Sequence, residues 1–160
     1  MEAEEIGLHG VRETLLVTLQ AKAAESAFPD SLLNDHFAAD LMRRLAGRPK
    51  PPDASHDMTI GIAVRAHMLD RWTSDFIGRH PDAIVLNLGC GLDTRVLRLD
   101  PPASVGWFDV DFPDVIALRQ QLFPKRPGCT TIASSITERD WIDLVPADRP
   151  AIVVAEGVFP

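Results

Sequence analysis

The sequence predicts an α/β fold in which a helical segment precedes a doubly wound parallel sheet. In the second half of the chain, short apolar runs of strand length alternate with segments of helical length and composition. Such an alternation of strands and helices is typical of a parallel sheet with right-handed crossovers. The first half has apolar residues at helical spacing. With 160 residues, 46% of them hydrophobic, the chain is long enough for one domain with a core.

Three helices are predicted in the first half, over residues 11–26, 32–45 and 58–77. In the first of them, one helical face is marked by Leu15, Leu16, Leu19 and Ala23. The segment 47–52 is a connector, because its three prolines cannot continue a helix and favour extended backbone. The third helix is expected to end at Gly78 as its C-cap, with Pro81 as the stop.

The first predicted strand, residues 83–88, is a continuous apolar run that leads directly into glycine. This pattern is typical of a strand that is buried on both faces of a parallel sheet. Similar runs follow at residues 105–110, 131–133 and 151–155. The helices expected between them cover residues 94–99, 113–123 and 137–144.

Composition and charge exclude several classes of partner. A formal charge of -7 and a pI near 5.1, without a cluster of basic residues, argue against a protein that binds nucleic acid through phosphates. The apolar stretches are far shorter than the roughly 20 residues of a membrane span. The N-terminus is acidic and is followed by no secretory signal, so we expect a cytoplasmic setting and no membrane partner.

A glycine turn and an acidic residue together predict a nucleoside site. Gly89 and Gly91 follow the first strand, where the missing Cβ allows a ligand to approach the backbone. About 20 residues later, Asp109 and Asp111 lie at the end of the second strand, where a carboxylate can accept hydrogen bonds from ribose hydroxyls. The third glycine of the dinucleotide fingerprint is replaced by Thr94, which counts against NAD. A methionine-bearing nucleoside has no pyrophosphate and does not need that glycine.

Three ordered motifs resemble those of the leucine carboxyl methyltransferase family, which includes the tetracenomycin-type polyketide O-methyltransferases. They are Asn-Leu-Gly-Cys-Gly-Leu-Asp-Thr-Arg at 87–95, Asp-Val-Asp-Phe-Pro at 109–113 and Val-Ala-Glu-Gly-Val at 154–158. The resemblance implies a Rossmann-like class I methyltransferase sheet, here incomplete with its first four strands, and an N-terminal helical extension. It also implies two parts, a helical cap at 1–82 and a truncated S-adenosyl-L-methionine-binding part at 83–160.

The same resemblance implies roles for individual residues. Arg65 would bind the methionine carboxylate of the cofactor, although a surface arginine on a helix is the alternative. Gly89 and Gly91 would line the methionine moiety through their backbone. Asp111 would hold the ribose, and we favour it over Asp109 because it begins the Asp-Phe-Pro motif; a solvated strand end is the alternative for either acid.

Two further positions follow from the resemblance. The pair that contacts adenine in the family, commonly Asp-Leu, corresponds here to Ser135 and Ile136, so that a serine replaces the acid. Glu156, at the end of the fourth strand, would pair with the methionine ammonium. A purely structural glutamate there is disfavoured, because a buried charge needs a partner.

The predicted activity is S-adenosyl-L-methionine-dependent O-methylation of a carboxylate or hydroxyl on a small, polyketide-like metabolite. A carboxylate acceptor needs no general base, and none of the five histidines has a context that distinguishes it, so we assign no catalytic base and no metal site. The alternatives are an NAD-dependent oxidoreductase and a non-catalytic module that binds a cofactor or a partner.

The chain ends shortly after the fourth predicted strand, at Pro160. We therefore expect this strand to present an apolar edge, which is a template for pairing with another chain. The corresponding hypothesis is that the chain alone is poorly soluble, inactive, or self-associates through the fourth strand.

Overall fold

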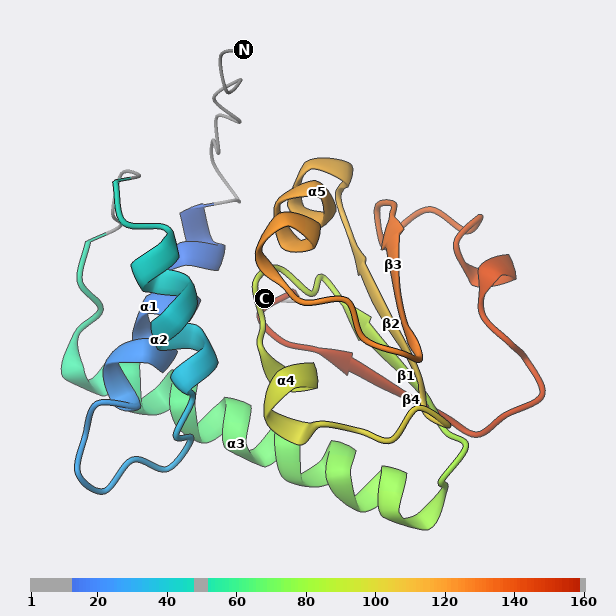
Figure 1. Cartoon of the computed structure of the whole chain (residues 1–160), viewed down its shortest axis with the longest axis horizontal. Coiled ribbons are helices and arrows are strands. Elements are labelled where there is room, and N and C mark those ends of the chain that lie inside the picture. Colours follow the sequence, from blue (N-terminus) through green and yellow to red (C-terminus); the bar gives the residue numbers. More distant parts are fainter. Residues whose placement is uncertain (1–12, 48–51, 159–160) are drawn as a thin grey trace.

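The four strands form one parallel sheet in the computed structural model, which describes residues 13–47 and 52–158 (Figure 1). They are β1 (Ile84–Leu88), β2 (Gly106–Asp111), β3 (Cys129–Ala133) and β4 (Ala151–Ala155), in the order β3-β2-β1-β4. Ile84 pairs with Gly106 on one side and with Ala151 on the other. The strand order therefore reverses beside β1, and the carboxyl ends of β1 and β4 enclose the point of reversal, where open α/β sheets bind ligands.

All four predicted strands are confirmed, and β4 has the predicted bounds. The two central strands, β1 and β2, bury their side chains on both faces, as the continuous apolar runs predict. The outer strands differ from them. On β4, Val154 is buried against the helices, but Val153 points to the opposite face and is 58% exposed.

Three helices precede the sheet: α1 (Glu13–Glu25), α2 (His36–Arg44) and α3 (His56–Arg79). The predicted residues 11 and 12 of the first helix and most of the 47–52 connector lie outside the described residues. The predicted start of the second helix at residue 32 is wrong, because Asp35 caps the helix by accepting a hydrogen bond from the Ala38 N–H. The third helix continues through Gly78, and its C-cap is His80.

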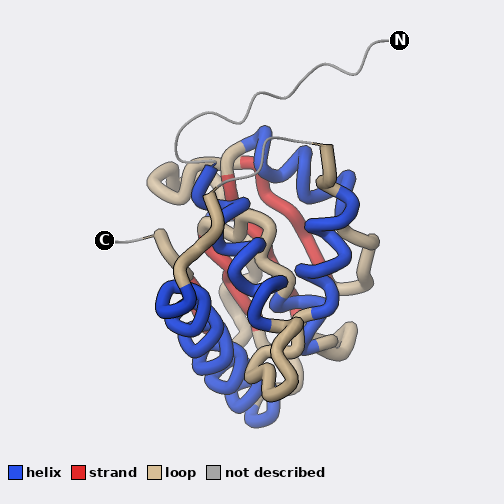
Figure 2. Tube along the Cα trace, turned by 90° about the vertical axis from the view of Figure 1, so that its left-hand side faces the viewer, coloured by secondary structure: helices blue, strands red, loops and turns tan. Residues whose placement is uncertain are grey.

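The helical segment lies along one side of the sheet. In Figure 1, α1 and α2 lie together near one end of α3, and the rest of α3 passes beneath the sheet. Figure 2 turns this end toward the viewer, and helices lie in front of the strands. The N-terminal helices therefore extend the molecule beyond the sheet while α3 connects them to it.

The helices α4 (Arg95–Leu99) and α5 (Pro113–Leu122) follow β1 and β2 as predicted. One face of the sheet packs Val85 and Trp107 against residues of α3 and α4. The other face packs Ile84 and Phe108 against Trp141, in the segment between β3 and β4.

The predicted helix over residues 137–144 is wrong. Within this segment the structure has a single 3₁₀ turn, Ile142–Leu144, labelled η2. Its backbone hydrogen bonds span three residues, such as Leu144 N–H to the Trp141 carbonyl. Trp141 is buried against one face of the sheet while Ile142 and Leu144 are exposed, so the packing of one aromatic side chain, and not a helix, fixes this segment.

No helix in the described ranges combines the length and the apolar character that crossing a bilayer requires.

Candidate functional site

A cavity of about 340 Å³ lies at the carboxyl ends of the strands. Each strand contributes the residues that follow it: 89–93 after β1, 111–112 at the end of β2, 134–137 after β3 and 156–158 after β4. One face of α1 also lines the cavity, through Thr14, Leu15, Thr18, Leu19 and Lys22. Its volume falls within the roughly 300–1,000 Å³ of small-molecule sites.

The glycine turn after β1 adopts a backbone conformation that favours glycine. Gly89 and Gly91 have φ angles of +59° and +47°, in the left-handed region. The Gly89 N–H donates to the Val110 carbonyl at 2.8 Å, which fixes the turn against the end of β2. A Cβ on Gly89 would also lie 2.5 Å from a methyl group of Val158. Both glycines line the cavity.

Asp111 lines the cavity and is held by backbone donors. Its Oδ2 accepts from the Gly91 N–H at 2.7 Å, and its Oδ1 accepts from the Phe112 N–H at 2.8 Å. Burial raises the pKa of this carboxyl, although the two backbone hydrogen bonds oppose the shift. Each carboxylate oxygen retains a further lone pair, so Asp111 can accept hydrogen bonds from a ligand.

Asp109, the alternative acid, does not line the cavity. Its carboxylate accepts from Asn87 Nδ2 at 2.8 Å and from Trp107 Nε1 at 3.0 Å. It also pairs with the buried guanidinium of Arg119, at 2.9 Å from Nε and 2.8 Å from the second nitrogen. These contacts use the carboxylate inside the protein, which supports the preference for Asp111 as the ligand-facing acid.

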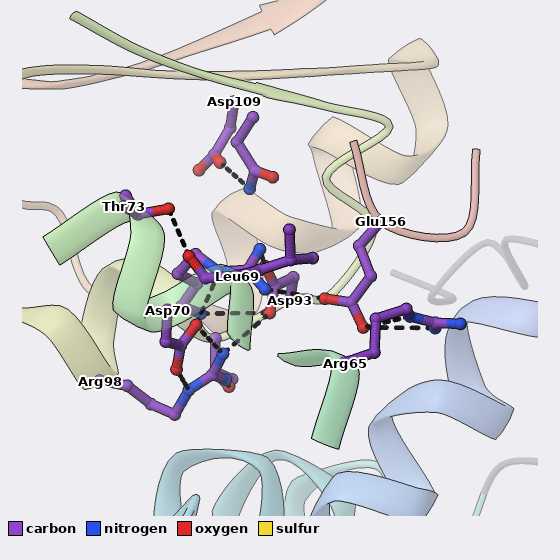
Figure 3. A network of polar contacts seen from close by, with 12 residues as sticks. Arg65, Leu69, Asp70, Thr73, Asp93, Arg98, Asp109 and Glu156 are labelled. Atoms are coloured by element: carbon purple, nitrogen blue, oxygen red, sulfur yellow. Dashed lines mark hydrogen bonds and ion pairs between the residues drawn. The ribbon is translucent and has the colours of Figure 1, made fainter. Parts of the chain in front are cut away.

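Glu156 lies at the opposite side of the cavity from the β2 end, after β4. Its Oε2 accepts from the Arg95 guanidinium at 2.8 Å and from Lys22 Nζ at 3.2 Å. Its Oε1 accepts from Arg65 at 3.3 and 3.4 Å. Figure 3 shows Glu156 and Arg65 facing one another beside the cluster that contains Asp93. Glu156 is thus a nearly buried acid with cationic partners, as its position in the apolar strand end requires.

Arg65 differs from the other predicted site residues. Its side chain is 46% exposed and does not line the cavity. It contacts the site through hydrogen bonds to Glu156. Among the predicted residues, the structure brings Gly89, Gly91, Asp111, Ser135, Ile136 and Glu156 together in the cavity wall, with Arg65 just outside it.

Ser135 and Ile136 follow β3 and line the cavity, as do Phe112 and Val115. The Ser135 hydroxyl is within 2.8 Å of the Thr137 hydroxyl, and it accepts from the Thr137 N–H at 3.3 Å. The wall therefore offers hydroxyl groups and an apolar side chain here, without the carboxylate that the related motif has.

Two charged residues of this site, Lys22 and Asp93, were not predicted from the sequence. Both line the cavity and pair at 3.1 Å. Burial by itself would raise the pKa of Asp93, but the charges of Arg95, Lys22 and Arg98 hold this pKa well below its usual range. A signal for Lys22 is present in the sequence: it lies seven residues after Leu15 and three after Leu19, on the apolar face of α1.

Comparison with known proteins agrees with the three motifs. The sequence profile of the family described as Leucine carboxyl methyltransferase matches residues 15–160. The Tetracenomycin polyketide synthesis O-methyltransferase TcmP of Streptomyces glaucescens is 49% identical over 158 residues, which cover 98% of this chain and 58% of that protein. The S-adenosyl-L-methionine-dependent methyltransferase dpfgK of Gibberella zeae is 33% identical over 175 residues, covering 100% of this chain and 59% of that protein.

The chain thus spans less than two thirds of the length of the curated relatives that it matches. Within this span, the match includes the glycine turn, the end of β2 and the end of β4, which together form part of the cavity wall. The chain belongs to the leucine carboxyl methyltransferase family.

Proposed function

We propose that this chain forms the S-adenosyl-L-methionine-binding part of an O-methyltransferase that acts on a carboxylate or hydroxyl of a small, polyketide-like metabolite. The observation that best supports this proposal is the cavity with a carboxylate in its wall at each side, Asp111 at the end of β2 and Glu156 after β4. The names of the relatives, which include a polyketide O-methyltransferase, support the same activity.

The donor set suits the two ends of this cofactor. Asp111 keeps acceptor capacity for ribose hydroxyls, and the neighbouring Ser135 and Ile136 would contact the adenine. Glu156 would pair with the methionine ammonium, and Arg65 would bind the methionine carboxylate. When bound, the cofactor supplies an electrophilic methyl group, and the protein contributes mainly alignment in a cavity that excludes water.

The environment of Thr94 favours this cofactor over NAD. Thr94 is buried, and its hydroxyl bonds to Asp35, the N-cap of α2, instead of leaving space for a pyrophosphate. The position therefore connects the glycine turn to the helical cap. We propose that residues 1–82 form this cap and residues 83–160 the cofactor part, with α1 of the cap closing one wall of the cavity.

Calorimetry tests the cofactor. The chain should bind S-adenosyl-L-methionine and its demethylated product S-adenosylhomocysteine, and it should not bind NAD. Asp111→Ala should abolish the signal, while Asp53→Ala, a change outside the cavity, should preserve it. Binding of NAD in place of S-adenosylhomocysteine would overturn the proposal.

Turnover is measured separately, with small carboxylic acids and phenols as acceptors, since binding without any turnover would favour a non-catalytic module.

A further inference from the structure

The guanidinium of Arg95 joins three carboxylates: the nearby Asp93 and two from distant parts of the chain, Asp70 and Glu156. Its Nε pairs with Asp70 of α3 at 2.7 Å, and its two terminal nitrogens pair with Asp93 at 2.7 Å and Glu156 at 2.8 Å. The Arg95 side chain is completely buried. Figure 3 shows Asp70 and Asp93 close together in this cluster, with Glu156 beside them. Because each nitrogen has its own partner, the orientation of the guanidinium is fixed.

Asp70 fixes this arrangement from outside the cavity. Its Oδ1 accepts from Arg95 at 2.7 Å and from Arg98 at 2.9 Å, and its Oδ2 accepts from Arg98 Nε at 2.7 Å. Neither Asp70 nor Arg95 lines the cavity. Whatever they contribute to ligand binding must therefore pass through a residue that does line it.

Arg95 contacts two residues of the cavity wall, Asp93 and Glu156. Of these, Glu156 has two oxygens with different surroundings. Oε2 is shared by two buried cations, Arg95 and Lys22, at 2.8 and 3.2 Å. Oε1 has the longer contacts with the half-exposed Arg65, at 3.3 and 3.4 Å. The buried cations therefore fix the orientation of the Glu156 carboxylate. Of its two oxygens, Oε1 has the partner that a ligand can replace more easily, because Arg65 is half-exposed.

We propose that Arg95, held by Asp70, is a positioning residue for Glu156. By binding Oε2 it turns Oε1 toward a ligand ammonium, without itself contacting the ligand. This inference rests on the proposed function, because it assumes that the ammonium belongs to the methionine moiety of the cofactor. A lysine at position 95 keeps the charge but lacks the planar guanidinium, whose separate nitrogens bind Asp70 and Glu156 at once.

The test compares two ligands that differ at the methionine end. S-adenosylhomocysteine has the ammonium and carboxylate, whereas methylthioadenosine retains the adenosine and the thioether and lacks both. In the full 160-residue chain, Arg95→Lys should weaken S-adenosylhomocysteine about tenfold or more, while the affinity for methylthioadenosine should change by less than about twofold. Asp70→Asn, which preserves side-chain shape, should give the same selective loss and serves as the test if Arg95→Lys does not fold.

Arg98→Lys is the matched control, because Arg98 is also a buried partner of Asp70 and does not contact Glu156. It should change the affinities for both ligands by the same factor. Glu156→Gln should itself weaken S-adenosylhomocysteine binding more than methylthioadenosine binding. Adding Arg95→Lys to Glu156→Gln should then cause no further loss that is specific to S-adenosylhomocysteine. Circular dichroism verifies the fold of each variant.

The outcomes separate this inference from the proposed function. If Arg95→Lys and Asp70→Asn weaken both ligands equally, or weaken neither, the positioning role is wrong even though the cofactor site stands. If the unchanged chain binds neither S-adenosylhomocysteine nor methylthioadenosine, the proposed function itself fails.

Discussion

Asp111 accepts a hydrogen bond from the backbone N–H of Gly91, with 2.7 Å between the nitrogen and Oδ2. This bond joins the end of β2 to the turn after β1, the two places that the sequence motifs mark. Asp111 therefore shapes the turn and lines the cavity at the same time. Asp109, two residues earlier, has all of its contacts inside the protein. The two acids should respond differently to the same substitution.

Asp109→Asn should reduce stability by about 3 kcal/mol or more, because it leaves the buried Arg119 guanidinium without its anionic partner. Asp111→Asn should cost only about 1 kcal/mol in stability, since it disturbs hydrogen bonds from two backbone N–H groups but leaves no guanidinium without its anionic partner. Its main effect should be the loss of S-adenosylhomocysteine binding. Urea unfolding and calorimetry measure the two effects. Loss of binding at unchanged stability in Asp109→Asn would reverse the assignment of the two acids.

Gly89→Ala should destabilise the protein by about 1–3 kcal/mol, because alanine is strained at positive φ and an added Cβ would overlap Val158. Gly61→Ala is the matched control. Gly61 lies inside α3 with open space around it, so alanine there should stabilise by about 0.5–1 kcal/mol. Thermal unfolding compares both variants. Equal changes in thermal stability would show that positive φ and the contact with Val158 do not restrict the residue at position 89.

Local sequence patterns were sufficient for the strands and the glycine turn. The apolar run of β1 and the glycines after it depend on neighbouring residues alone, and both are confirmed. The segment 137–144 has a helical composition, but its conformation depends on where Trp141 packs, which the local pattern does not contain. Tertiary packing overrides propensity in such short segments.

The charged part of the site could not be predicted from local patterns. Lys22 and Glu156 are 134 residues apart in sequence, and only the tertiary fold brings them within 3.2 Å of each other. Arg95 belongs to a recognised motif, yet its partner Asp70 has no sequence signal. The lysine on the apolar face of α1 was the one local indication, and a buried lysine requires an acid nearby.

The depressed pKa of Asp93 predicts how stability depends on pH. Burial opposes this shift, but the charges of Arg95, Lys22 and Arg98 exceed it, so the folded protein binds this proton less tightly than the unfolded chain. Asp93 therefore stabilises the fold above the unfolded pKa of about 4, and this contribution is lost as the pH falls below that value. Urea unfolding between pH 6 and pH 3 should show decreasing stability.

Asp93→Asn is the control for this pH dependence. The variant should be less stable at pH 7, and its stability should fall less steeply between pH 5 and pH 3. The raised pKa of Asp111 acts in the opposite direction, because its protonation favours the folded state, so Asp111→Asn should make the fall steeper. If stability changed with pH identically in the unchanged chain, in Asp93→Asn and in Asp111→Asn, the roles assigned to these two carboxyl groups would be contradicted.

The exposed apolar residue of β4 predicts self-association of this chain. In the part of the chain that the structure describes, β4 is an outer strand that pairs with β1 on one side, and its Val153 is 58% exposed. An outer strand with exposed apolar residues favours pairing with another chain, and a lysine there opposes it. Val153→Lys should therefore shift the chain toward the monomer in size-exclusion chromatography with light scattering.

Met58→Lys, at an exposed apolar position on α3, is the control and should leave the elution unchanged, because a helix offers no unpaired strand edge. Elution of the unchanged chain as a monomer at every concentration would contradict this prediction.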